Sequence, residues 1–293
     1  MNVMSRNIEL NQPSPTGTDF AEMAPGPIII FGAPMSGTTY LREIVNKHPD
    51  VHITYETRVF QWMFRCLTKV SADDFALYTH KDKFLELAVP HLKELVHDFF
   101  RSIGQNVKYW GDKNPFYGGN KECLEFILST YPETKFIHIY RDGRDVVTSL
   151  TRKKSGAGKP WADFEKAHEL WSKFVTNGNS FAVENKENCL GVKYEQLVAD
   201  DELAARKIFE FLGIDFSNSV LEFCKKQKYD RTVLSGPTRN IKVTGANSSE
   251  WRKVFTRPQQ LASLDLIENE LIMLGYETEE TIKKEREKLA QNV

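Results

Sequence analysis

The feature that most constrains the fold is an apolar run followed at once by a short glycine-rich loop. The run, residues 27–31, is Pro-Ile-Ile-Ile-Phe, which is typical of a strand buried inside a parallel sheet. The loop lies between Gly32 and Gly37, and the stretch after it carries Leu41 and Ile44 at helical spacing. A strand, a glycine-rich turn and a helix form a P-loop, whose backbone N–H groups and helix N-terminus surround an anion.

One missing residue decides which anion this loop suits. Gly32 and Gly37 have the spacing of a nucleoside-triphosphatase loop, but Thr38 stands where such a loop has its lysine. Without that cation the outer phosphates of ATP lose their main contact, whereas a 5′-phosphate with an attached anion still suits the loop. The alternative is a tight turn that binds nothing. The hydrogen-bonding side chains of Ser36 and Thr39 argue against it.

Strand and helix patterns alternate along the chain, which predicts one three-layer α/β domain with a central parallel sheet. We place this domain at residues 25–275, between a flexible tail at 1–24 and a charged tail at 276–293 that is helical or disordered. The loop at 155–160 is either a lid or a plain connector. Expected strands are 27–31, 51–53, 107–110, 134–140 and 189–192. Expected helices are one after the glycine-rich loop, then 58–67, 81–103 with a break or kink at Pro90, 123–131, 142–152, 161–184, 201–212, 217–228 and 258–274.

Composition excludes several classes of partner. The 39 Lys and Arg balance 40 Asp and Glu, so we expect no nucleic-acid partner. The four cysteines lie far apart and fit no metal spacing, which indicates free thiols in a reducing compartment. Pro49 prevents His48 and His52 from sharing a helix face, so we expect no metal site. No apolar run approaches the roughly 18 residues that span a bilayer. Residues 1–24 lack the apolar core of a signal peptide, so we expect no membrane contact.

Seven short motifs in a fixed order connect the loop with the rest of the chain. They are Gly32-Ala33-Pro34-Met35-Ser36-Gly37-Thr38-Thr39, His48-Pro49-Asp50-Val51, Glu56-Thr57-Arg58-Val59, Asp112-Lys113-Asn114-Pro115-Phe116, Arg141-Asp142-Gly143-Arg144, Thr151-Arg152-Lys153 and Tyr194-Glu195-Gln196-Leu197-Val198. In these motifs the chain resembles the sulfotransferases that use 3′-phosphoadenosine-5′-phosphosulfate (PAPS), and within them most closely the tyrosylprotein sulfotransferases. The resemblance implies PAPS as donor and adenosine 3′,5′-bisphosphate (PAP) as product. Because the transferred sulfonate is a monoanion, we expect no need for Mg²⁺.

The resemblance also implies a donor site. Arg141 follows a strand and Ser149 lies two turns into the next helix, and a guanidinium with a hydroxyl suits a phosphate monoester. By resemblance these two residues, together with Arg152, hold the 3′-phosphate of PAPS. The other implied nucleotide contacts are Pro34, Met35, Ser36, Gly37, Thr38, Thr39, Tyr40, Tyr194, Ser249 and Trp251. For Trp251, the alternative to a nucleotide contact is an ordinary position in the hydrophobic core.

Ion pairs at the helix start are the alternative for the arginines of this region. Arg141 precedes Asp142, and Arg144 precedes Asp145. We expect the ion-pair role for Arg144 and the phosphate role for Arg141.

Three residues are candidates for catalysis. By resemblance, Lys113 stabilises the charge that develops on the leaving phosphate, with a surface lysine as the alternative. The resemblance places Glu56 at the general base, and a buried carboxylate with a raised pKa suits that role. The alternative for Glu56 is an ion pair with Arg58 or Arg42. His52 is the competing base, because other PAPS sulfotransferases use a histidine.

The acceptor is the least constrained part of the prediction, because Met35 departs from the family pattern. The family usually has a basic residue there, in contact with the leaving group. The eukaryotic tyrosylprotein enzymes are membrane-anchored proteins of the secretory pathway, and no such anchor is seen here. We therefore expect a cytoplasmic enzyme whose acceptor is a hydroxyl or nitrogen of a small molecule such as a natural product. A peptide tyrosine is the alternative, and a homodimer is the candidate assembly. Competing functions are a P-loop kinase and a nucleotide-binding module that has lost transfer.

Overall fold

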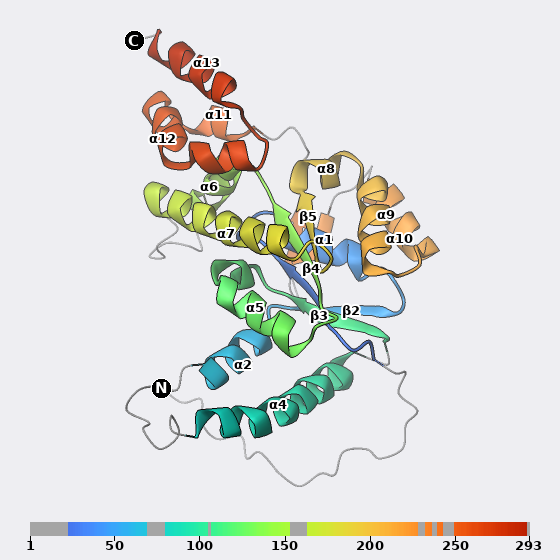
Figure 1. Cartoon of the computed structure of the whole chain (residues 1–293). Coiled ribbons are helices and arrows are strands. Elements are labelled where there is room, and N and C mark those ends of the chain that lie inside the picture. Colours follow the sequence, from blue (N-terminus) through green and yellow to red (C-terminus); the bar gives the residue numbers. More distant parts are fainter. Residues whose placement is uncertain are drawn as a thin grey trace, which may run out of the picture.

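The structure is a computed structural model, and it describes residues 23–68, 80–104, 107–152, 163–227, 232–235, 239–242 and 249–291. Its centre is a parallel sheet of five strands in the order β2-β3-β1-β4-β5 (Figure 1). The strands are β1 (Ile28–Phe31), β2 (Val51–Tyr55), β3 (Tyr109–Lys113), β4 (Lys135–Tyr140) and β5 (Cys189–Lys193). The predicted α/β fold with a central parallel sheet is therefore confirmed.

Helices cover both faces of the sheet. One face carries α1 (Thr38–Val45), α8 (Tyr194–Ala199), α9 (Asp201–Leu212) and α10 (Asn218–Gln227). The other face carries α2 (Val59–Thr68), α4 (Lys81–Ile103), the 3-10 helix η1 (Pro115–Gly119), α5 (Lys121–Thr130) and α7 (Phe164–Glu184).

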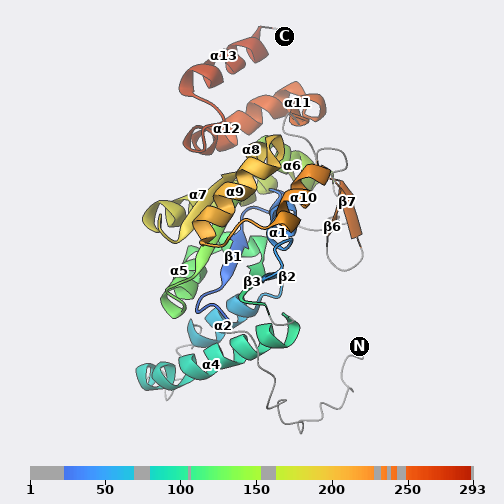
Figure 2. The ribbon, with the colours of Figure 1, turned by 90° about the vertical axis from the view of Figure 1, so that its right-hand side faces the viewer.

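A third group of helices packs beyond the sheet. It consists of α6 (Gly143–Thr151), α11 (Trp251–Val254), α12 (Arg257–Met273) and α13 (Glu279–Ala290). In both views α11, α12 and α13 lie at the end of the molecule opposite α4 (Figures 1 and 2). A separate antiparallel pair is formed by β6 (Thr232–Ser235) and β7 (Arg239–Lys242).

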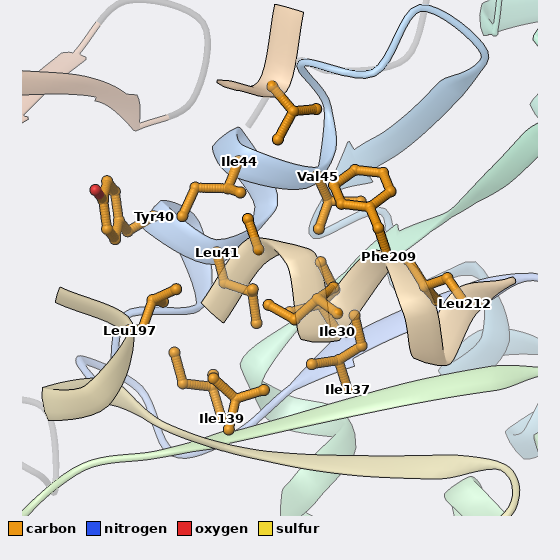
Figure 3. Packing of buried hydrophobic residues seen from close by; sticks show 14 of the residues in the cluster. Ile30, Tyr40, Leu41, Ile44, Val45, Ile137, Ile139, Leu197, Phe209 and Leu212 are labelled. Carbon is orange, nitrogen blue, oxygen red and sulfur yellow. The ribbon is translucent and has the colours of Figure 1, made fainter. Parts of the chain in front are cut away.

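The apolar run that opens the domain is buried on both sides. Ile28 and Ile30 belong to the hydrophobic cluster under α1, α8 and α9, whereas Ile29 and Phe31 belong to the cluster under α2, α5 and α7. Alternate side chains of a strand point to opposite faces, so a strand covered on both faces must be apolar throughout. Figure 3 shows the first cluster, where Ile30 lies among side chains of α1 and α9.

Several element boundaries differ from the expected ones. The second strand continues to Tyr55 and the third ends at Lys113, because both pair with neighbouring strands up to those residues. Of the break or kink expected at Pro90, the break is wrong, since α4 is one helix across it. Pro90 lies on the exposed side, where water can satisfy the carbonyl that loses its N–H partner.

Parts of the prediction fall outside the described residues, namely the loop at 155–160 and all but residues 23 and 24 of the N-terminal tail. The charged C-terminal stretch forms α13, whose Ile282 and Leu289 are buried in the third cluster. Among the described helices, none combines the length and the apolar character that crossing a bilayer requires.

Candidate active site

The sheet gathers the predicted site residues along one edge. Tyr55 and Ile30 both pair with Lys113, so β2, β3 and β1 end side by side. Tyr140 pairs with Lys193, so β4 and β5 also end together. The segments that follow these strands therefore lie in the order Glu56, Lys113, P-loop, Arg141 and Tyr194. In open α/β sheets this carboxyl edge is where ligands bind.

The P-loop is shaped by two close approaches that only glycine permits. A Cβ at Gly32 would lie 2.1 Å from the carbonyl oxygen of Ile139. A Cβ at Gly37, whose φ is 97°, would lie 2.4 Å from the Tyr194 ring. The loop is thus pressed against the ends of β4 and β5, which brings it to Arg141 and Tyr194.

The side chains and backbone of the loop fit an anion. Ser36 is fully buried, yet its hydroxyl has no hydrogen-bond partner within the described residues. A buried hydroxyl is normally hydrogen-bonded, so this orphan is explained by a ligand at the loop. The helix α1 starts directly after Gly37, with no side-chain cap, which leaves its first N–H groups for the same ligand. These features fit the phosphate of PAPS.

Arg141 occupies the position expected for a phosphate contact. Its guanidinium stacks on the Tyr194 ring at 4.6 Å and donates to the carbonyl oxygen of Met35 at 3.4 Å. Arg141 is 6% exposed, and no ion pair between its side chain and Asp142 is found. The expected alternative of an Arg141–Asp142 pair is therefore not seen, and the cation lies between the P-loop and β5.

Arg144 is held in ion pairs, as expected, but its partners differ from the expected Asp145. It pairs with Asp142 at 2.7 Å and with Glu277 at 2.6 Å. Its guanidinium also stacks on Trp251 at 4.3 Å. Asp145 instead accepts the backbone N–H of Trp251.

The remaining predicted donor contacts lie on α6 and just before α11. The Ser149 hydroxyl donates to the carbonyl oxygen of Asp145 at 2.9 Å. Arg152 pairs with Glu250 across a surface where both side chains are about half exposed, so this pair can rearrange at little cost. Ser249 is exposed, whereas Trp251 is 2% exposed and packs in the third hydrophobic cluster.

Other loop residues differ in how far they face the site. Tyr40 is 2% exposed and belongs to the cluster with Leu41 and Ile44, at whose edge it lies in Figure 3. Pro34 and Thr39 are half-buried, and Thr38 is buried at the helix start. Tyr194 begins α8, directly after β5 ends at Lys193.

Glu56 and Lys113 form an ion pair at the ends of β2 and β3. Lys113 Nζ donates to Glu56 Oε1 at 2.7 Å and lies 3.4 Å from the centre of the Tyr55 ring. The lysine side chain is 0% exposed, so the surface-lysine alternative is wrong. The Glu56 side chain is 29% exposed, not buried as expected. Its ion-pair partner is neither Arg58 nor Arg42, since Arg42 pairs with Glu43.

Asp112 fixes this pair in place, a role that the sequence did not suggest. Its carboxylate accepts the hydroxyls of Thr54 and Tyr117, each at 2.7 Å, and the backbone N–H of Thr57 at 3.2 Å. These bonds tie the turn that carries Glu56 to β3. Asp112 and Lys113 are neighbours in one strand, so their side chains point to opposite faces of the sheet. This alternation is the sequence signal that could have indicated a separate role for Asp112.

His52 lies in β2, three residues before the strand ends. Three residues of strand span about 10 Å, so the ring is remote from the end where Glu56 lies. Burial, followed by the charge of Arg42, lowers the pKa of His52. The structure thus brings Glu56, and not His52, to Lys113.

A pocket of about 420 Å³, not foreseen from the sequence, lies between α2, η1, α5 and α7. One of its lining residues is Arg58, two residues after Glu56 in the sequence. Its lining combines arginine and amide side chains with aromatic rings: Arg58, Gln61, Phe64, Arg65, Phe116, Gly119, Asn120, Cys123 and Phe174. Among the described residues, no group of three or more His, Cys, Asp or Glu side chains is arranged to hold a metal ion.

Solved structures share this fold. A mouse sulfotransferase complexed with PAP matches with a TM-score of 0.55 and 18% identity, over 86% of each chain. The sulfotransferase domain of the Synechococcus PCC 7002 olefin synthase matches with a TM-score of 0.54 and 21% identity, over 86% of this chain and 96% of that one. At these identities the likeness concerns the fold alone.

Sequence comparison finds relatives at higher identity. Protein-tyrosine sulfotransferase 1 of Danio rerio is 30% identical over 203 residues, which covers 66% of this chain and 55% of that protein. Protein-tyrosine sulfotransferase 2 of Gallus gallus is 30% identical over 204 residues, which covers 66% and 53%. The chain spans about half the length of the curated relatives it matches. A family model described as the sulfotransferase family matches residues 27–218. Because this match covers more than half of the sequence, the chain belongs to the sulfotransferase family.

Proposed function

We propose that this chain transfers the sulfonate group of PAPS to a tyrosine hydroxyl of a peptide or protein. The observation that carries this proposal is the order of groups along the sheet edge. A carboxylate–lysine pair, an anion loop and a buried arginine follow one another there. Sulfonate transfer from PAPS requires the same order: a base, then a site for the transferred group, then a site for the second phosphate of the nucleotide.

The donor half of the site offers separate contacts to two anionic groups of PAPS, its 5′-phosphate and its 3′-phosphate. The P-loop offers the Ser36 hydroxyl and the first N–H groups of α1 to the 5′-phosphate. Arg141, held between Met35 and Tyr194, offers a charged fork to the 3′-phosphate. Ser149 lies on α6, the helix that Arg141 precedes, and Arg152 directly follows that helix; both would join Arg141 there.

The chemistry follows from the Glu56–Lys113 pair. The acceptor oxygen attacks sulfur, its bond to sulfur forms, and the bond from sulfur to the 5′-phosphate oxygen breaks. The acceptor proton passes to the Glu56 carboxylate, and the electron pair of the broken bond stays on the phosphate of PAP. Lys113, buried beside Glu56, places a positive charge where that negative charge develops.

A peptide acceptor has more support than the small molecule expected from the sequence. The relatives at about 30% identity are named protein-tyrosine sulfotransferases. The pocket lined by Arg58, a residue two positions after the base in the chain, carries two arginines among phenylalanine rings. It suits an acceptor with an aromatic ring and nearby negative charge.

The acceptor is tested with two peptides that differ in one residue. We expect the chain, given PAPS, to add one sulfonate mass to an acidic peptide containing a single tyrosine, and none to the same peptide with phenylalanine. A third peptide with neutral flanks should react more slowly, because it lacks charge for Arg58 and Arg65. Equal transfer to the tyrosine and phenylalanine peptides, or transfer only to small hydroxylated molecules, would contradict the peptide acceptor.

Arg141→Ala should weaken PAP binding by about 2–3 kcal/mol, which is the scale of lost charge-assisted hydrogen bonds. Isothermal titration calorimetry on the folded variant measures this directly. Arg206→Ala is a matched control, because Arg206 also stacks on an aromatic ring, Phe216 at 4.3 Å, but lies on α9. Unchanged PAP affinity in Arg141→Ala would remove this arginine from the donor site.

A further inference from the structure

Five residues close a ring of hydrogen bonds and ion pairs beside the donor site. Glu195 Oε1 accepts the backbone N–H of Asp142 at 3.2 Å, and the Asp142 carboxylate pairs with Arg144 at 2.7 Å. Arg144 reaches Glu277 at 2.6 Å. The neighbour of Glu277, Tyr276, donates its hydroxyl to Glu195 Oε2 at 2.7 Å. The ring therefore joins the β4–α6 turn, the start of α8 and the α12–α13 turn.

The ring holds the immediate chain neighbours of two donor-site residues. Asp142 directly follows Arg141, and Glu195 directly follows Tyr194. Arg141 and Tyr194 are the stacked pair, at 4.6 Å, that faces the P-loop. The bond from the Asp142 N–H to Glu195 fixes the two turns relative to each other. This bond therefore keeps the side chains of Arg141 and Tyr194 in fixed positions relative to each other.

The third turn is anchored independently of the ring. Lys193 Nζ donates to the carbonyl oxygen of Gly275 at 3.2 Å and lies 3.8 Å from the centre of the Tyr276 ring. Gly275 has φ 67°, and the Tyr276 N–H bonds back to Leu271 at 2.8 Å. The Tyr276 hydroxyl is thus presented to Glu195 by a rigid turn.

The ring members are buried or half-buried, so breaking the ring is costly. The Asp142, Arg144 and Glu277 side chains are 13%, 5% and 16% exposed. Burial raises the pKa of Glu195, and it also raises the pKa of Tyr276 well above its ordinary value, assisted by the nearby Glu195 charge. A buried carboxylate that loses a donor is left undersatisfied, so it relaxes by moving. A movement of Glu195 is passed to Tyr194, because the two are consecutive residues at the start of α8.

We propose that Glu195, Tyr276 and Glu277 are positioning residues that hold Arg141 and Tyr194 in place for the 3′-phosphate of the nucleotide. Tyr276 and Glu277 lie beyond residue 218, where the family match ends. The C-terminal turn would thus set donor affinity in this chain through contacts that the family pattern does not contain. This inference rests on the proposed function, because it requires that the chain bind PAP.

The test compares PAP with AMP, which lacks the 3′-phosphate. Tyr276→Phe removes one hydroxyl and should weaken PAP binding about tenfold, the effect of one lost hydrogen bond to a charged group. The affinity for AMP should stay unchanged, because only the 3′-phosphate site is displaced. In the Arg141→Ala background, Tyr276→Phe should weaken PAP no further, since its effect passes through Arg141.

Tyr131→Phe is the matched control. Its hydroxyl is also buried, has no partner within the described residues, and belongs to the cluster under α2 and α5. PAP affinity should be unchanged in this control. Glu277→Gln breaks the ring at another point and should reproduce the selective loss of PAP affinity, which keeps the test informative if Tyr276→Phe does not fold.

The outcomes separate the two proposals. Wild-type protein that fails to bind PAP overturns the proposed donor site itself. Wild-type protein that binds PAP, with ring variants of equal affinity, overturns the positioning role alone. An equal loss of PAP and AMP affinity, or an additive loss with Arg141→Ala, also overturns it, because the ring would then act on general stability.

Discussion

Glu56→Gln is expected to lower the turnover number by about 10²–10⁴-fold, the usual contribution of a general base. The amide has nearly the shape of the carboxylate, and its oxygen can still accept from Lys113, which lies 2.7 Å away. The lysine therefore keeps a partner, and the ends of β2 and β3 stay in place. PAP affinity should remain at the wild-type value, because the donor contacts lie at the P-loop and beyond. Turnover with a tyrosine peptide and calorimetry with PAP measure the two quantities.

His52→Ala serves as the control that distinguishes the two candidate bases. His52 lies about 10 Å of strand before Tyr55, the residue that precedes Glu56, so its loss should change turnover only slightly. If His52→Ala took the large loss and Glu56→Gln were mild, the base assignment would be reversed. Loss of PAP binding in Glu56→Gln would show instead that this carboxylate supports the donor site.

The sheet and the donor loop could be predicted from local patterns. The run at 27–31 is apolar because both faces of β1 are covered, and Gly32 and Gly37 are required by contacts at 2.1 and 2.4 Å. Arg141 could be placed because it directly follows a strand, and strand ends in a parallel sheet meet at one edge. Each of these signals is local: an apolar run, the spacing of two glycines, or an arginine that directly follows a strand.

Contacts between distant segments could not be predicted in the same way. Glu56 and Lys113 lie 57 positions apart, and their contact depends on the register of β2 with β3. Nearby arginines therefore looked like the better partners for Glu56. The role of Asp112 and the shape of the pocket at Arg58 depend on helices packed from several parts of the chain. The small-molecule acceptor was expected because the sequence shows no membrane anchor and no basic residue at position 35. Such missing features say less about the acceptor than the names of the relatives do.

Met35 replaces the usual basic residue of the family, and the structure gives it a backbone role. Its φ is 72°, which lies in the left-handed region that is unfavourable for any residue other than glycine. Its carbonyl oxygen accepts a hydrogen bond from the Arg141 guanidinium. Its side chain packs against the cluster of α6 and α7. Met35 thus shapes the loop without supplying a charge, which leaves Lys113 as the buried cation beside Glu56.

Lys113→Met is therefore expected to lower turnover by about 10²–10³-fold, the cost of removing a group that stabilises developing charge. Methionine fills most of the buried volume, and the partly exposed Glu56 carboxylate can turn to water, so the fold should persist. PAP binding should weaken as well. Lys225→Met is the control, because it breaks an ion pair with Glu222 on α10, on the sheet face opposite the pocket, and should leave both quantities unchanged.

The double variant Glu56→Gln with Lys113→Met decides what the lysine does. If Lys113 only holds the base, the double variant should be as slow as Glu56→Gln alone, because there is no base left to hold. If Lys113 also carries the charge of the leaving phosphate, the double variant should be slower than either single variant. We expect the second result, because the lysine is fully buried at the end of β3, directly beside the strand that leads into the P-loop. A double variant no slower than Glu56→Gln, with unchanged PAP affinity, would limit Lys113 to orienting the base.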